Sequence, residues 1–140
     1  MRASLLMKAP PVMCAPTTSV SAVCQMMDER RVGCVVVVRG GEVIGIVTDR
    51  DIALRVVARG LSGDVAVDTV MTRNVVKLTV DADVVTAEAT MARCDVRRLP
   101  IVDADGRLHG VISLDDIVRF IGRQADGVTD VLAHQARSTS

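Results

Sequence analysis

The apolar and polar positions repeat along the chain. When the chain is shifted against itself by 64 residues, Val20 falls on Val84. The second copy then has one extra residue in a turn, and at the new offset of 65 residues Gly45 falls on Gly110. Other matched pairs are Met7 and Met71, Val12 and Val76, Met27 and Met91, Thr48 and Ser113, Asp51 and Asp116, and Ile52 and Ile117. The pattern predicts an internal duplication.

Each copy is expected to begin with a short strand and a helix. The short apolar segments are Val12-Met13 in the first copy and residues 74–80 in the second. Apolar residues then recur with the spacing of one helix face, and Ser19 and Asp83 precede these helices as N-caps. The apolar stripes are Val20, Val23, Cys24 and Met27 in the first copy and Val84, Ala87 and Met91 in the second.

Two strands and a second helix complete each copy. The expected strands are residues 34–38 and 42–47 in the first copy and residues 99–102 and 107–112 in the second. The run CVVVV is continuously apolar and β-branched, which is typical of a strand buried on both faces. Gly40-Gly41 and Gly106 are expected to form the hairpin turns.

This order predicts an α+β fold of tandem β-α-β-β-α repeats. Since neither half could bury its sheet alone, the two sheets are expected to pack together about a pseudo-two-fold axis. The first repeat is expected at residues 5–60, a linker at 61–69 and the second repeat at 70–124, followed by a helix end and flexible tail at 125–140. The second helix of the second repeat is expected to run towards Ala133, and residues 136–140 to fray.

Composition narrows the possible partners. There are 17 basic and 17 acidic residues, and the absence of a basic surplus disfavours nucleic acid. The N-terminus resembles no signal peptide and no apolar run approaches the ~18 residues of a membrane span, so a cytoplasmic protein is expected. The cysteines lack zinc-site spacing and are expected to be small buried hydrophobes with reduced thiols. They are Cys14, Cys24, Cys34 and Cys94.

Thr48-x-x-Asp51 and Ser113-x-x-Asp116 hold the candidate chemistry, each at a strand-to-helix corner. A hydroxyl followed three residues later by an acid is close to a helix capping box, so both motifs could be structural. Alternatively, the hydroxyl and the free amides of the helix N-terminus could hold a phosphate, and the carboxylate could accept hydrogen bonds from a ribose diol. Two such corners are expected to face one cleft, with the base between aliphatic side chains, because the chain lacks Tyr and Trp.

Other residues have two possible roles. Arg50, Arg97 and Arg98 could neutralise phosphates or be solvated. Pro100 interrupts a strand ladder and could free backbone groups for a ligand or mark a sheet edge. His109 is expected to be a half-exposed strand residue and not a catalytic base.

The segments GIVTDRDI and RRLPIVDADGRLHGVISLDDI resemble the two halves of a cystathionine-β-synthase (CBS) domain pair, or Bateman module. The resemblance covers about residues 5–122. It implies that Thr48, Asp51, Ser113 and Asp116 contact ribose and phosphate. It also implies base-binding residues on neighbouring strands: Val76, Lys77, Arg98, Leu99 and Pro100 in the second repeat, and Met13, Cys14, Cys34, Val35 and Val36 in the first. Val36 stands where the family often has proline, so the second repeat is favoured as the occupied site.

The resemblance implies a non-catalytic regulatory module that binds an adenosine nucleotide (AMP, ADP or ATP) and requires no cofactor. It further implies a homodimer formed through the repeat helices, and a signal passed to a separate protein partner. The alternative is a structural or interaction module with unoccupied sites. An enzyme is disfavoured because no nucleophile with a positioned base is evident.

Overall fold

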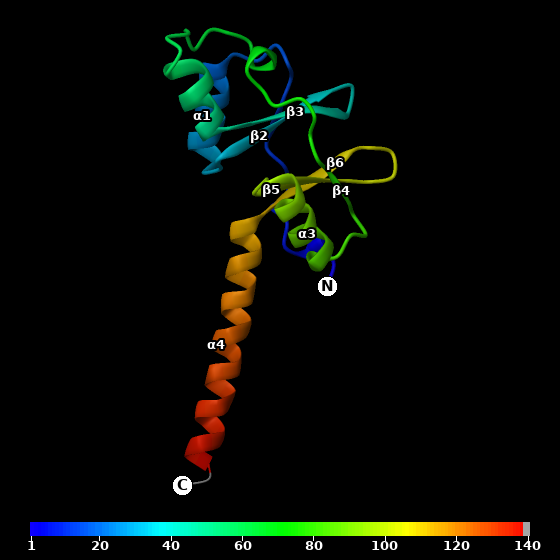
Figure 1. Ribbon diagram of the computed structural model, residues 1–140, viewed down its shortest axis with the longest axis vertical. Coiled ribbons are helices and arrows are strands. Elements are labelled where there is room, and N and C mark those ends of the chain that lie inside the picture. Colours follow the sequence, from blue (N-terminus) through cyan, green and yellow to red (C-terminus); the bar gives the residue numbers. More distant parts are fainter. Residues whose placement is uncertain (139–140) are drawn as a thin grey trace.

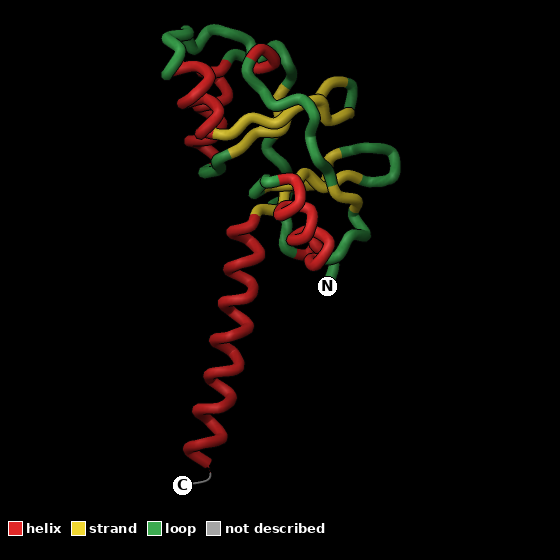
Figure 2. The backbone as a smooth tube through the Cα atoms, viewed as in Figure 1, coloured by secondary structure: helices red, strands yellow, loops and turns green. Residues whose placement is uncertain are grey.

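The structure is a computed structural model that describes residues 1–138. It contains two three-stranded sheets with the strand orders β1-β2-β3 and β4-β5-β6, each covered by helices (Figures 1 and 2). The first repeat comprises β1 (Met13–Cys14), α1 (Val20–Arg30), β2 (Cys34–Arg39), β3 (Glu42–Thr48) and α2 (Asp49–Ile52), which continues as a π-helical turn (Ala53–Val57). The second comprises β4 (Leu78–Thr79), α3 (Val84–Cys94), β5 (Arg98–Val102), β6 (Leu108–Ser113) and α4 (Leu114–Ser138). The predicted α+β repeat fold is confirmed.

The first helix of each repeat begins and ends at matched positions. The Ser19 hydroxyl accepts a hydrogen bond from the Ala22 amide at 3.1 Å, and the Asp83 carboxylate accepts one from the Thr86 amide at 2.7 Å. Both helices end at a left-handed residue, Arg31 in α1 and the equivalent Asp95 in α3. The predicted caps are therefore confirmed in both repeats.

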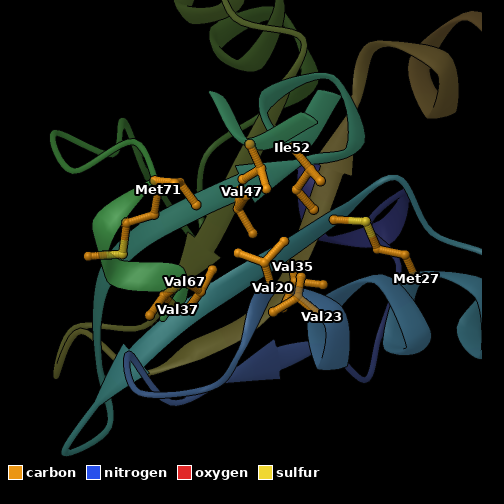
Figure 3. Close-up of a cluster of buried hydrophobic side chains, with 11 residues drawn as sticks. Val20, Val23, Met27, Val35, Val37, Val47, Ile52, Val67 and Met71 are labelled. Atoms are coloured by element: carbon orange, nitrogen blue, oxygen red, sulfur yellow. The ribbon is translucent and has the colours of Figure 1, made fainter. Parts of the chain in front are cut away.

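Buried side chains form one core in each repeat and a third cluster where the sheets meet. Figure 3 shows the first core, in which α1 packs on β2 and β3. Leu99, Ile101 and Ile112 are fully buried in the second core. In the third cluster, Val36 and Val43 of the first sheet pack with Val102 of the second. The two sheets therefore share a buried interface, as the duplication predicted.

The cysteines differ from expectation. Cys34 is buried and Cys14 and Cys94 are partly buried, but Cys24 is exposed, and all four are free. On α1, Val20, Val23 and Met27 face the core. The inclusion of Cys24 in the buried stripe was therefore wrong, because the i+4 position lies at the rim of this narrow helix face.

The last strand of each repeat is hydrogen-bonded to the segment that precedes the first strand of the other repeat. Lys8 and the β6 residue Val111 exchange backbone hydrogen bonds of 2.9 and 3.2 Å, so the N-terminal segment crosses to the second repeat. Ile46 on β3 and Thr72, which follows the linker, exchange equivalent bonds of 3.0 and 2.9 Å. The N-terminal segment therefore leads into the first repeat and is hydrogen-bonded to the second.

Gly110 permits this crossing. A Cβ atom at position 110 would lie 2.7 Å from the carbonyl oxygen of Lys8 and 2.7 Å from Sδ of Met7. We expect Gly110→Ala to lower the free energy of unfolding by about 1–3 kcal/mol through overpacking, measured by chemical denaturation. The matched control is Gly122→Ala, where nothing lies within 4 Å and the better helix former should be neutral or stabilising. Equal effects of the two substitutions would contradict the close approach.

The helix α4 is longer than expected. It continues to Ser138 and projects away from both sheets (Figure 1), so residues 136–138 are helical where fraying was predicted. Residues 139 and 140 of the predicted frayed tail lie outside the described residues.

Candidate functional site

The two strand-to-helix corners have the same local geometry. At the first, the Thr48 hydroxyl accepts from the Asp51 amide at 3.1 Å, and the Thr48 amide donates to Oδ2 of Asp51 at 2.9 Å. Ser113 and Asp116 make the same pair of bonds at 3.1 and 2.9 Å. Both motifs are capping boxes. Because capping uses one carboxylate oxygen, the surroundings of the other oxygen distinguish the corners.

At the first corner an arginine occupies the second oxygen. Oδ1 of Asp51 lies 3.3 Å from a guanidinium nitrogen of Arg55. The same guanidinium donates to the carbonyl oxygen of Val70 at 2.8 Å and to the hydroxyl of Thr72 at 3.1 Å. Arg55 therefore joins the corner to the segment after the linker and occupies Oδ1 of Asp51.

At the second corner the equivalent of Arg55 is Phe120. In the part of the chain that the structure describes, Oδ1 of Asp116 has no hydrogen bond or ion pair. The side chain lines a cavity of about 180 Å³ between the repeats. The lining residues are Lys8, Pro10, Pro11, Val12, Arg31, Val32, Gly33, Cys34, Arg98, Val111, Ser113, Asp115, Asp116 and Arg119.

The cavity combines aliphatic walls with an excess of cations. Its charged lining consists of Lys8, Arg31, Arg98 and Arg119 against Asp115 and Asp116. Asp115 is moreover 3.5 Å from the guanidinium of Arg97, in an exposed ion pair. The lining therefore favours an anionic ligand with an apolar part. Ligand pockets usually start at ~300 Å³, so a drug-sized ligand would extend beyond this cavity towards the exposed arginines at its rim.

The structure brings together four of the residues predicted for ligand binding: Arg98, Ser113 and Asp116 of the second repeat and Cys34 of the first. Thr48 and Asp51 lie at the other corner and do not line this cavity, so the expected convergence of both corners on one cleft is not observed here. Arg50 is exposed, and its backbone amide bonds to Asp49.

The remaining predicted base-binding residues lie behind or away from the cavity. Leu99 and Pro100 are fully buried, as are Val35 and Val36. Val76 packs against the second core, whereas Lys77 lines a separate surface groove near the hairpin turns. Met13 is half exposed and Cys14 partly buried. None of these side chains lines the cavity described above.

Sequence reasoning missed the contribution of the N-terminal segment and of the α1–β2 turn. Lys8, Pro10 and Pro11 come from the former, and Arg31 and Val32 from the latter. The available signal was Gly110, since a glycine within a strand often marks a close backbone approach. It indicated that another segment crosses β6 beside Ser113.

Cys34 offers a chemical probe of the cavity. Burial raises the pKa of its thiol, and the nearby Arg98 guanidinium opposes that rise only in part. Since a raised pKa leaves less thiolate at neutral pH, we expect Cys34 to alkylate at least about tenfold more slowly than exposed Cys24 at pH 7.5. Mass spectrometry after iodoacetamide treatment measures both rates. Equal rates would contradict the burial of Cys34.

His109 lies outside the cavity, in a pair with Asp103 whose closest atoms are 2.9 Å apart. The hydrogen bond from His109 lowers the pKa of Asp103, with a further contribution from the Arg107 amide. This pair holds the hairpin turn between β5 and β6. Among the described residues there is no metal-binding cluster of His, Cys, Asp and Glu, and no helix long and apolar enough to span a membrane.

Comparison with known proteins identifies the two repeats. The family model described as CBS domain matches residues 3–58 and 66–123. CBS domain-containing protein YhcV of Bacillus subtilis is 36% identical over 123 residues, which cover 86% of this chain and 87% of that protein. CBS domain protein PAE2072 from Pyrobaculum aerophilum, solved in complex with AMP, is 29% identical with a TM-score of 0.77, covering 83% of this chain and 89% of that chain.

A further solved structure supports the fold alone. The CBS domain pair of protein MJ0100, in complex with 5-methylthioadenosine and S-adenosyl-L-methionine, is 23% identical with a TM-score of 0.80. The match covers 89% of this chain and 98% of that chain. The paired arrangement of sheets therefore recurs in proteins with little sequence identity to this one.

Proposed function

Because this chain belongs to the CBS domain family, we propose that it is a non-catalytic regulatory module that binds AMP, ADP or ATP in the cavity between its repeats. The observation that carries the proposal is the unpaired Oδ1 of Asp116 in a cavity with aliphatic walls and surplus cations. The complex of PAE2072 with AMP supports an adenosine ligand.

The ligand chemistry follows from the cavity lining. Asp116 would accept hydrogen bonds from the ribose diol, and the Ser113 hydroxyl, which accepts from the Asp116 amide, would donate its own proton to a phosphate oxygen. Arg98, Arg31 and Arg119 would balance the phosphate charge. The base would lie against the aliphatic residues, among them Pro11, Val12 and Val111. We propose one nucleotide per chain, because Arg55 already occupies Oδ1 of Asp51 at the other corner.

Binding would act on the packing of the repeats. The cavity is lined by both, so a nucleotide that binds one relative arrangement more tightly would shift the population towards it. We further propose that the chain is a cytoplasmic homodimer that passes this shift to a separate protein partner. Four free cysteines are consistent with a reducing compartment.

A thermal-shift series with AMP, ADP, ATP, NAD and S-adenosylmethionine tests the proposal. An extrinsic dye is needed because the chain has no Trp or Tyr. A ligand at 100 times its Kd adds ~2.7 kcal/mol of stability, so a clear rise in Tm is expected with at least one of the first three. No rise with any of them at millimolar concentration would contradict the proposal.

The complete capping boxes favour a second candidate function. Thr48, Asp51, Ser113 and Asp116 all have structural hydrogen bonds, so the chain could be an interaction module whose corners serve only the fold. That function predicts no nucleotide response from the wild-type chain, and only a loss of stability when Asp51 or Asp116 is replaced.

A further inference from the structure

Three cations at the rim of the cavity have no acidic partner within residues 1–138. They are Lys8, Arg31 and Arg119, all exposed and all part of the cavity lining. None of the three side chains forms an ion pair in this described part of the chain. Asp115 does not neutralise them, because its ion pair is with Arg97. The rim therefore carries positive charge that the protein itself leaves unbalanced.

The duplication shows that the fold of a repeat does not need these cations. The equivalent positions around the other corner hold Thr72, Asp95 and Leu54. Arg31 and Asp95 have the same backbone conformation, with φ of 52° and 53°, at the ends of α1 and α3. The positive charge therefore belongs to this cavity and not to the architecture that both repeats share.

The helix end alone does not explain Arg31. A cation at a helix C-terminus interacts favourably with the helix dipole, but α1 already has Arg30 in its last turn. After α3 the same position holds Asp95, of opposite charge, and the helix ends in the same way. The left-handed conformation also suits aspartate better than arginine. The remaining explanation for an arginine at position 31 is the cavity that it lines.

The size of the cavity leaves the phosphates of a nucleotide at this rim. Its volume of about 180 Å³ is smaller than that of a typical ligand pocket, so a nucleotide with its base enclosed extends its phosphates towards the exposed cations. At neutral pH the phosphate of AMP carries about two negative charges, and each further phosphate adds about one more. The three unpaired cations, together with Arg98, exceed what a single phosphate neutralises.

Given the proposed nucleotide site, on which this step rests, we propose that the cavity selects ADP and ATP over AMP and that Arg31 determines this preference. Arg31 ends the first helix of the first repeat, whereas Arg98 and the Ser113–Asp116 corner belong to the second repeat. A nucleotide that extends to Arg31 connects the two repeats directly. The number of phosphates would thus set how strongly the ligand shifts the packing of the repeats.

Isothermal titration calorimetry of the full chain with AMP, ADP and ATP tests the preference. The buffer contains EDTA, so that each nucleotide carries only its own charge, and about 0.1 M salt, which screens charges beyond ~10 Å. Wild type is expected to bind ADP and ATP at least about tenfold more tightly than AMP, the order of magnitude for one more charge pair near a protein surface. Arg31→Asp is expected to weaken ATP binding at least about tenfold and AMP binding no more than about threefold.

The matched control is Arg30→Asp. Arg30 is the neighbouring exposed residue at the end of α1 and does not line the cavity, so the same change of charge there should keep the preference for ADP and ATP. Arg31→Asp is expected to fold, because Asp95 occupies the equivalent left-handed position. A cooperative thermal transition of each variant checks this.

The possible failures are distinguishable. Wild-type affinities for the three nucleotides that agree within about threefold would overturn the selection and leave the nucleotide site standing. A preference that survives Arg31→Asp, or that Arg30→Asp removes equally, would contradict the role of Arg31. Absence of binding by all three nucleotides would overturn the proposed function itself, and the selection with it.

Discussion

Asp116→Ala is expected to weaken AMP binding about 30- to 150-fold, corresponding to about 2–3 kcal/mol for hydrogen bonds to a charged group. The reason is that Oδ1 of Asp116 is the unsatisfied acceptor in the cavity. The substitution also removes the capping bond to the Ser113 amide, which should lower the free energy of unfolding by about 1 kcal/mol. Isothermal titration calorimetry and chemical denaturation measure the two effects.

The duplication supplies a matched control in Asp51→Ala. Asp51 makes the same capping bonds as Asp116, so at least the same loss of stability is expected, with a further loss from the ion pair with Arg55. Its second oxygen is paired with Arg55 and it does not line the cavity, so AMP affinity should stay within about twofold of wild type. If both variants lose affinity equally, the distinction between the corners is wrong.

Arg55→Ala is expected to lower the free energy of unfolding by about 1–2 kcal/mol. The loss of a fully buried charged network would cost more, but Arg55 is partly exposed, and solvent weakens its interactions. The substitution removes the contacts to Asp51, the Val70 carbonyl and the Thr72 hydroxyl. It also frees Oδ1 of Asp51. We therefore expect the number of AMP molecules bound per chain to rise from one towards two.

Arg59→Ala is the control for Arg55→Ala. Arg59 lies four residues further along the chain and is exposed. Its substitution removes the same positive charge as Arg55→Ala but breaks none of these contacts. It should leave both stability and stoichiometry unchanged. An unchanged stoichiometry in Arg55→Ala, at saturating AMP, would contradict the assignment of Arg55 as the group that closes the first corner.

Local signals predicted most of the fold. Ser19 and Asp83 gave the correct helix starts because an N-cap depends only on its neighbours in sequence. The apolar β-branched run at residues 34–38 gave a buried strand for the same reason. The corners were also anticipated as capping boxes, since the bonds span only three residues.

Contacts between distant segments could not be predicted in this way. The exchange between Lys8 and Val111 places the N-terminal segment beside Ser113, more than 100 residues away in the chain. The role of Arg55 depends on its hydrogen bond to Thr72, a contact that no local pattern in the sequence indicates. The sequence analysis expected the neighbours of Ser113 and Asp116 to come from strands of the second repeat, whereas the cavity also contains residues of the N-terminal segment and of the α1–β2 turn. The corner that lines the cavity does belong to the second repeat, which was favoured for the ligand.

The most direct measurement of the central claim is a crystal structure grown with AMP. Density for one nucleotide per chain is expected in the cavity, with the ribose hydroxyls on Asp116, the phosphate among Arg98, Arg31 and Arg119, and Arg55 still paired with Asp51. Density at the Thr48–Asp51 corner in place of this cavity, or an empty cavity at millimolar AMP, would contradict the account.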